Sequence, residues 1–260
     1  MKPIWSVLLV VVTMFAQALA GSLPASLLLG RDNVLRQPLG ALGITVAGLL
    51  FVYLIRRFLD RRPWSALGWH KPSGILLGVV AGLVPVLVAG VLSLAAGAAT
   101  RMPMDASALA WLPLAALVLL LNQAFPEELL WRGHLVDTLS ARLSMRTVVI
   151  VSSVVFGAMH IISQSAAVTV LEKVLYVVMA VALGFACTAA RVRGGGLWMA
   201  VGVHWGFHIG LRLLPLQPVN FGVQLVLMTV TLTLAGAVLL KGHRTKSEQP
   251  IETRSSQPLG

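Results

Sequence analysis

Residues 108–132 read ALAWLPLAALVLLLNQAFPEELLWR, and this stretch decides what kind of protein the chain is. It holds no charged side chain from Ala108 to Phe125 and then two adjacent glutamates, Glu127 and Glu128. An apolar run of about 20 residues is long enough to cross a bilayer as a helix. One acid at membrane depth costs about 2.5–3.5 kcal/mol, and two neighbouring carboxylates also repel each other. A span that only anchored the chain would not hold such a pair, so the glutamates indicate a function.

The composition of the whole chain is that of a polytopic membrane protein. Of its 260 residues, 57% are hydrophobic and 11% are charged, and the mean hydropathy is +0.87. The formal net charge is +11, but no basic patch with interleaved aromatic residues occurs, which argues against nucleic-acid binding. The single Cys187 excludes an internal disulfide and a multi-cysteine metal site, and we interpret it as a small core residue.

Eight apolar runs predict an all-α fold, a polytopic bundle of about eight transmembrane helices. Lys and Arg are concentrated in alternate connections, which places 15 of the 20 basic residues on one side of the membrane. Because cytoplasmic loops carry the excess of basic residues, we expect both termini inside the cell (N-in and C-in). The predicted runs cover residues 4–20, 38–55, 74–99, 108–131, 147–163, 168–190, 195–213 and 219–240.

The first run has a second interpretation. Lys2, an apolar core and the sequence Ala-Leu-Ala before Gly21 are typical of a secretory signal with a small-residue cleavage site. Cleavage would leave seven spans with every later loop on the same side, so the charge bias does not decide between the two; we favour the uncleaved helix. We assign residues 1–240 to one membrane-embedded helical domain. Residues 241–260, polar and rich in Ser, Gln and Pro, are expected to form a disordered cytoplasmic tail.

The glutamates differ in the partners that their own helix offers. Glu128 and Arg132 are four residues apart, so on a helix they share a face and can form an ion pair. Glu127 points about 100° away and stays free for another role. Pro126 removes a backbone donor just before the pair and can bend the helix there. In the alternative interpretation, both glutamates lie at the headgroup level and are solvated.

Three histidines lie in later apolar runs. His160 is part of VVFGAMHI (154–161), and His204 and His208 are part of VHWGFHI (203–209). His204 and His208 are four residues apart and share one helix face. This spacing suits joint ligation of a metal or two donors aimed at one substrate atom. For His160 alone, the simpler interpretation is a hydrogen-bonded core residue.

Together, these segments resemble the motifs of the CAAX-protease and bacteriocin-processing family, a group of intramembrane proteases. The first motif, two glutamates, three variable residues and an arginine, is EELLWR at 127–132. The second is FGAMH at 156–160 and the third is HWGFH at 204–208. All three occur in order in separate runs, and the resemblance covers about residues 105–215. The third motif departs from the family, because His208 stands where an asparagine is usual; imidazole can still donate a hydrogen bond or bind a metal.

The resemblance implies an intramembrane endopeptidase that hydrolyses peptide bonds in membrane-associated proteins or peptides. Peptide hydrolysis needs water, a base that activates it and donors for the developing oxyanion. We therefore expect Glu127 to be the general base, with His160 helping to hold the attacking water. His204 and His208 would stabilise the oxyanion. Cleavage would take place near the cytoplasmic face, since the fourth run is predicted to end there.

The same resemblance implies which residues support the site and which could hold a cofactor. Glu128 and Arg132 would hold the site together as an ion pair. The family has been described both as metal-dependent and as metal-free glutamate proteases, so the cofactor stays open, and we favour a metal-free site. If one divalent metal such as zinc is bound, its candidate ligands are Glu127, His160, His204 and His208.

Two other kinds of function stay open. A non-catalytic relative would keep the fold as a membrane scaffold or regulator. His208 at the asparagine position is the feature that leaves this alternative open. A cation transporter could use the Glu/His cluster, although transport paths usually spread ionisable groups across the membrane. The expected partners are a membrane protein or peptide substrate and the lipid bilayer, with no nucleic acid. The resemblance implies a bacterial inner membrane, and prenylated CAAX proteins and leader peptides are both open as substrates.

Overall fold

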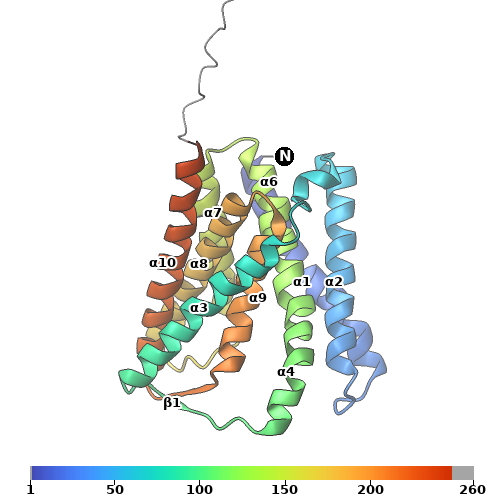
Figure 1. Cartoon of the computed structure of the whole chain (residues 1–260). Helices are drawn as coiled ribbons and strands as arrows, with labels where there is room; N and C mark the ends of the chain where they lie inside the picture. The colour runs from blue at the N-terminus through green and yellow to red at the C-terminus, as the bar shows by residue number, and fades with distance from the viewer. Residues whose placement is uncertain (1, 248–260) are drawn as a thin grey trace, which may run out of the picture.

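The computed structural model describes residues 2–247, with side chains as far as Lys241, and shows a bundle of long helices (Figure 1). Within this part of the chain, seven helices are long and apolar enough to cross a membrane. The predicted all-α polytopic bundle is therefore confirmed. The predicted seventh run is also helical, but at 17 residues it spans only about 25 Å of a hydrocarbon core that is about 30 Å thick.

The elements follow the predicted runs closely. A π-helical turn, η1 (Ile55–Asp60), prolongs α2, and a 3-10 turn, η5 (Met159–Ile162), prolongs α7. A further 3-10 turn, η2, covers Trp64–Leu67. The long helices are α1 (Pro3–Leu28), α2 (Arg36–Leu54), α3 (Gly74–Ala95), α7 (Met145–Ala158), α8 (Val170–Gly194), α9 (Leu197–Leu213) and α10 (Phe221–Ser247), together with a compound helix over 106–140.

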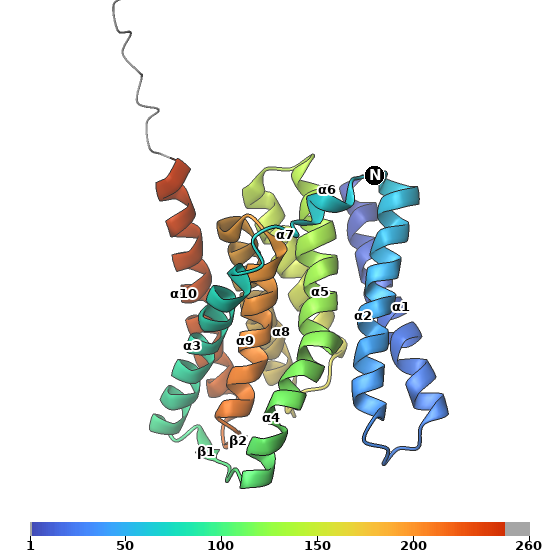
Figure 2. The ribbon, with the colours of Figure 1, turned by 45° about the vertical axis from the view of Figure 1, so that its right-hand side comes forward.

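Helix α1 begins and helix α10 ends at one end of the bundle, which we call the terminal end; the other is the opposite end (Figures 1 and 2). The connection after α2 lies at the terminal end, whereas the connections after α1 and α3 lie at the opposite end. There, a short strand β1 (Ala99–Arg101) pairs antiparallel with β2 (Leu216–Pro218). The sequence did not predict this ribbon, which ties the end of α3 to the α9–α10 connection.

The two ends of the chain differ from the predicted boundaries. Helix α1 runs unbroken past Gly21, the candidate cleavage position, to Leu28. At Gly21, the backbone of α1 meets the backbone of Gly43 and Ile44 in α2 so closely that a Cβ would collide. The first run is thus packed as an integral helix of the bundle. Helix α10 continues through Ser247, beyond the predicted start of the tail at 241, while residues 248–260 lie outside the described part.

The compound helix carries the two glutamates in its interior. Its predicted end at residue 131 is wrong, because the helix continues to Ser140 and puts Glu128 about 18 Å from that end. The glutamates belong to a short α-helical piece enclosed between two wider π-helical segments, a feature that is frequent at functional sites. The pieces are α4 (Ala106–Leu119), η3 (Leu120–Ala124), α5 (Phe125–Glu128), η4 (Leu129–Leu135) and α6 (Val136–Ser140).

Helices α3 and α9 pack backbone to backbone. A Cβ on Gly202 of α9 would collide with the Ile75 carbonyl of α3, and one on Gly78 of α3 would collide with the Met199 carbonyl of α9. Small residues at a four-residue spacing allow such close contact between membrane helices. Because His204 and His208 lie on α9, this contact fixes where both histidines stand.

An ionic cluster ties the connection after α2 to α6 at the terminal end. Asp137 accepts hydrogen bonds from Arg56 Nη1 at 2.9 Å and from Arg62 Nε at 2.8 Å. Arg56 is only 2% exposed, so its charge depends on the carboxylate of Asp137. Two arginines of the segment between α2 and α3 are therefore bound to the compound helix.

We expect Asp137→Asn to lower the free energy of unfolding by about 3–5 kcal/mol, because it leaves the buried guanidinium of Arg56 without its counter-charge. Thermal unfolding in detergent measures the effect. The matched control is Asp105→Asn at the exposed start of α4, where Asp105 caps the helix by accepting from the Ala108 N–H at 2.7 Å. Asparagine caps helices as well as aspartate does, so the control should stay near the wild type. Equal loss in both variants would contradict the cluster's role.

Candidate active site

One cavity of about 760 Å³ collects the ionisable side chains that the sequence analysis selected. Glu127, His160, His204 and His208 all line it, although they come from α5, η5 and α9. The remaining walls come from α3, α8 and α10, and α1 contributes Met14. Three segments that lie far apart in the sequence therefore meet at one space inside the bundle.

The cavity runs from the middle of the bundle toward the opposite end. Its outer part is lined by 163–166 between η5 and α8, and by Leu214, Leu216, Pro218 and Phe221 around β2. No lining residue comes from the terminal-end connections 61–73 or 141–144. The cavity therefore lies farther from the terminal end than the predicted end of the fourth run at residue 131 implied. The cause is the misplaced end of the compound helix, which continues well past the glutamates.

Glu128 and Arg132 form the ion pair that their spacing predicts, and they lie behind the cavity wall. Arg132 Nη1 donates to Glu128 Oε1 at 3.0 Å, and both side chains are 0% exposed. The guanidinium also donates to the Gly184 carbonyl at 2.8 Å and to Thr188 Oγ1 at 3.3 Å, both in α8. It further lies 4.5 Å from the ring centroid of Phe156 in α7. The alternative of glutamates solvated at the headgroup level is wrong for Glu128.

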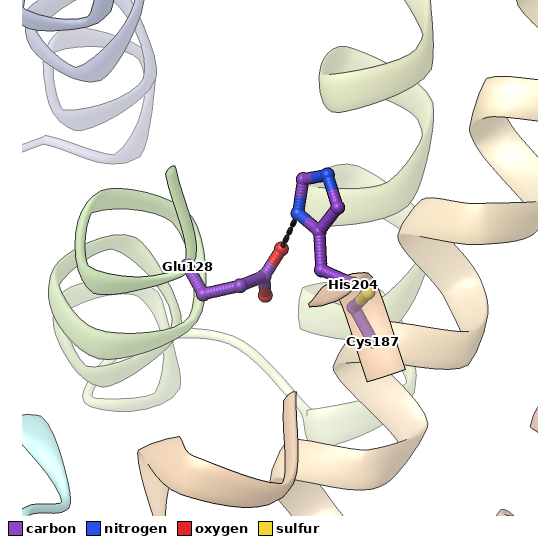
Figure 3. Close-up of side chains that lie close together, drawn as sticks. All are labelled: Glu128, Cys187 and His204. Carbon is purple, nitrogen blue, oxygen red and sulfur yellow. Dashed lines mark hydrogen bonds and ion pairs between the residues drawn. The ribbon is translucent and has the colours of Figure 1, made fainter. Parts of the chain in front are cut away.

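Glu128 has a second partner that the sequence did not predict. His204 Nδ1 lies 2.9 Å from Glu128 Oε1 (Figure 3), and His204 is 3% exposed. A carboxylate at this position accepts, so Nδ1 carries the hydrogen. The bond leaves Nε2 of His204 as the ring nitrogen available to the cavity. The buried ion pair therefore fixes the orientation of a histidine that lines the cavity.

Glu127 stands in contrast to its neighbour. It is partly exposed, it lines the cavity, and among the described residues its carboxylate has no hydrogen-bond partner. His160 Nδ1 lies 3.0 Å from the Phe156 carbonyl, which can only accept, so Nδ1 is the donor. Nε2 of a neutral His160 is then an acceptor facing the cavity. A carboxylate and an imidazole acceptor thus share a space that can hold water.

His208 extends the histidine face of α9. Its ring stacks on that of His204 with 5.0 Å between centroids and 22° between planes. Its Nε2 is buried and has no hydrogen-bond partner among the described residues. A buried ring nitrogen without a partner is costly unless a ligand or water satisfies it. The imidazole at the family's asparagine position therefore offers an unused polar atom at the cavity.

One group of side chains in residues 2–247 has the ligand atoms for a metal close together: Glu128, Cys187 and His204, within 4.8 Å of one another (Figure 3). The group does not fit a divalent cation. Glu128 already binds the buried guanidinium of Arg132, and that positive charge opposes a second one. The four candidate ligands expected from the sequence, Glu127, His160, His204 and His208, do not form such a group in the described part.

Comparison with known families finds a match over the part of the chain that carries the three motifs. The family model described as type II CAAX prenyl endopeptidase Rce1-like matches residues 109–210, which contain all three motifs. Over these residues the chain is similar to that family. The resemblance over 105–215 is thereby confirmed, including its place among the CAAX proteases. No curated protein matches the chain.

The polar residues of the cavity that were not selected from the sequence include Gln123, Tyr176 and Gln224. Gln123 precedes Glu127 by four residues, so helical spacing alone would have placed both on one face. The Tyr176 ring lies 5.9 Å from that of His160, a contact between separate helices that no local pattern reveals. These groups can orient a bound peptide without being charged.

We expect Arg132→Gln to cost about 3–5 kcal/mol of unfolding free energy, because it leaves a buried carboxylate unpaired. The double variant with Glu128→Gln should lose less than the sum of the single changes, since the two charges are removed together. Thermal unfolding in detergent checks this. Arg142→Gln, at an exposed position of the 141–144 connection, serves as the control and should change stability by less than about 0.5 kcal/mol. Additive losses in the double variant would contradict the buried pair.

Proposed function

We propose that this protein is an intramembrane endopeptidase that hydrolyses peptide bonds of membrane-associated proteins or peptides, with Glu127 activating the water. The observation that carries the proposal is the unpaired carboxylate of Glu127 in the same cavity as three histidines. The family match supports it, because the family is one of endopeptidases. A cavity of about 760 Å³ is in the range that encloses small ligands and short peptide segments.

Glu127 is the general base in this proposal. Its carboxylate takes a proton from a water that also donates to Nε2 of His160, and the resulting hydroxide attacks the scissile carbonyl. Glu127 suits this role better than Glu128, whose Oε1 is occupied by Arg132 and His204. The proton held by Glu127 then passes to the leaving amine.

His204 and His208 receive the oxyanion. Donation from Nε2 of His204 requires a proton on that nitrogen as well as on Nδ1, which lies 2.9 Å from the Glu128 carboxylate. His208, stacked on His204, supplies a second donor at the position where the family usually has asparagine. Preorganised donors of this kind stabilise the tetrahedral intermediate more than the ground state. Glu128 and Arg132 act by positioning, since neither lines the cavity.

The chemistry proposed here needs no metal. In the cluster of Glu128, Cys187 and His204, Glu128 already binds the buried guanidinium of Arg132, and every step above moves protons between water, named side chains and the substrate. Metal analysis of the purified, active protein tests this part separately. A divalent ion that is needed for activity and is bound by Glu127, His160, His204 or His208 would replace the metal-free version.

We expect Glu127→Gln to abolish cleavage, lowering the rate by about 10²–10⁴-fold, because the amide cannot accept the proton of water. The measurement compares protein termini in cells that express the wild type or Glu127→Gln, where uncleaved precursors should accumulate in the variant. A purified assay with any precursor so identified then gives the rate. Gln164→Glu, a neutral position in the outer cavity lining, is the control for a changed charge and should keep most of the activity.

The same experiment separates the alternatives. A scaffold or regulator would keep its cellular effect in Glu127→Gln and show no accumulated precursor. A transporter would lose ion flux in proteoliposomes instead of cleavage. Unchanged termini in Glu127→Gln, with the protein folded and present at the wild-type level, would refute the proposed protease.

His208 allows a sharper test of the oxyanion role. His208→Asn should keep activity within about tenfold of the wild type, because an amide can donate in place of the imidazole. His208→Ala should lower the rate constant by about 10²–10³-fold, as loss of one oxyanion donor does, with little change in KM. Cleavage assays on an identified precursor measure both. If His208→Ala matched His208→Asn, the ring would have no role in the reaction.

A further inference from the structure

We infer that Thr45 in α2 is a positioning residue for Glu127, because its hydroxyl holds the helical turn that directs this carboxylate into the cavity. Thr45 acts through Glu127, so its role in catalysis rests on the proposed function. It lies outside the residues 109–210 that match the family. Three features of the structure lead to this role: a hydrogen bond between two helices, the proline at position 126 and the π-helical turn η3.

The hydroxyl of Thr45 differs in its partner from several other buried hydroxyls of the bundle. Those of Thr13, Ser93, Ser153 and Thr188 donate to the carbonyl four residues earlier in their own helix. Oγ1 of Thr45 donates instead to the Leu121 carbonyl in η3, on another helix. Thr45 is only 7% exposed, so this bond is made inside the protein. It connects α2 to the helix that carries Glu127.

The Leu121 carbonyl needs a donor from outside its helix because of Pro126. In η3, the N–H of Phe125 donates to the Leu120 carbonyl, five residues earlier. The next donor in this register would be residue 126, and proline has no N–H. An unpaired backbone carbonyl within a membrane protein is costly. The hydroxyl of Thr45 therefore supplies a hydrogen bond that the helix cannot make for itself.

A second contact brings α2 against the same turn. Gly48 follows Thr45 by three residues, so both lie on one face of α2. A Cβ added at Gly48 would stand 2.7 Å from Gln17 Oε1 and 3.4 Å from Pro126 Cβ. The backbone of α2 thus lies close to the proline that precedes Glu127. The turn is held at Leu121 and at Pro126, and its position follows that of α2.

The register of this turn decides which glutamate faces the cavity. A π-turn closes its hydrogen bond one residue later than an α-turn, and one residue of an α-helix corresponds to about 100° of rotation. The same angle separates Glu127 from Glu128. Conversion of η3 to an α-helix would turn both carboxylates by about this angle relative to α4. The bond from Thr45 therefore holds the register in which Glu127, and not Glu128, lines the cavity.

Cleavage kinetics on an identified precursor test the role of the hydroxyl. Thr45→Val should lower kcat by about 10–100-fold with little change in KM, because a misplaced base slows the chemistry more than binding. Thr45→Ser keeps the donor and should stay within about threefold of the wild type. Thr13→Val is the matched control, since the Thr13 hydroxyl donates within its own helix. Equal kcat values in Thr45→Val and Thr13→Val would overturn the inference.

A second measurement does not depend on cleavage. Dicyclohexylcarbodiimide modifies carboxyl groups in apolar surroundings, and fragment mass spectra give the labelled fractions of Glu127 and Glu128 separately. We expect the label on Glu127 in the wild type, because Glu128 is paired with Arg132. In Thr45→Val the labelled fraction of Glu127 should fall by about threefold or more, whereas Thr45→Ser and Thr13→Val should keep it. Loss of activity in Thr45→Val with unchanged labelling would overturn the inference.

The two measurements separate this inference from the proposed function. If labelling follows the expectation but no cleavage depends on Glu127, the positioning by Thr45 stands and the protease fails. If cleavage depends on Glu127 while Thr45→Val changes neither kcat nor labelling, the protease stands and the inference fails.

Pro126→Ala extends the test to the case in which Thr45→Val does not fold on its own. The substitution gives residue 126 an N–H that can reach the Leu121 carbonyl. In this background, adding Thr45→Val should change the labelled fraction of Glu127 by less than about twofold, because the two changes act on one carbonyl. A loss of labelling as large as that expected for Thr45→Val alone would overturn the inference.

Discussion

The guanidinium of Arg132 holds together helices of this protein that lie far apart in the sequence. From one buried position, it binds Glu128 on its own helix and the Gly184 carbonyl on α8, and it lies over the ring of Phe156 on α7. Through Glu128, it also orients His204 on α9. A buried charge with one partner missing is strongly destabilising, so the four helices are held to one arrangement. The cavity exists where that arrangement leaves space.

The two adjacent glutamates have separate duties because a helix turns by about 100° between them. Glu128 faces the interior, where its charge is neutralised and its oxygen is shared by Arg132 and His204. Glu127 faces the cavity, where its carboxylate has no hydrogen-bond partner among the described residues. A single carboxylate could not be both a fixed anchor and a free base. Two adjacent glutamates are therefore needed, one as the anchor and one as the base.

Much of this could be predicted from the sequence, and the errors have physical causes. Apolar runs near 20 residues predicted the helices, and the four-residue spacing predicted the Glu128–Arg132 pair, because both patterns are local. The end of the compound helix was misplaced because Arg132 looked like a membrane edge, whereas Glu128 neutralises it inside the bundle. The His204–Glu128 bond, Tyr176 and the direction of the cavity depend on contacts between separate helices, which spacing along one helix does not report.

The close contact of α3 with α9 has a consequence for how the protein can change shape. Backbones that touch at Gly78 and Gly202 leave no room to slide or rotate past each other. The wall that carries His204 and His208 is therefore rigid during any turnover. Accommodation of a peptide has to come from other walls of the cavity, such as the segment 163–166 between η5 and α8. The histidine wall of α9 and the parts of the lining that can move are in this way separate segments of one cavity.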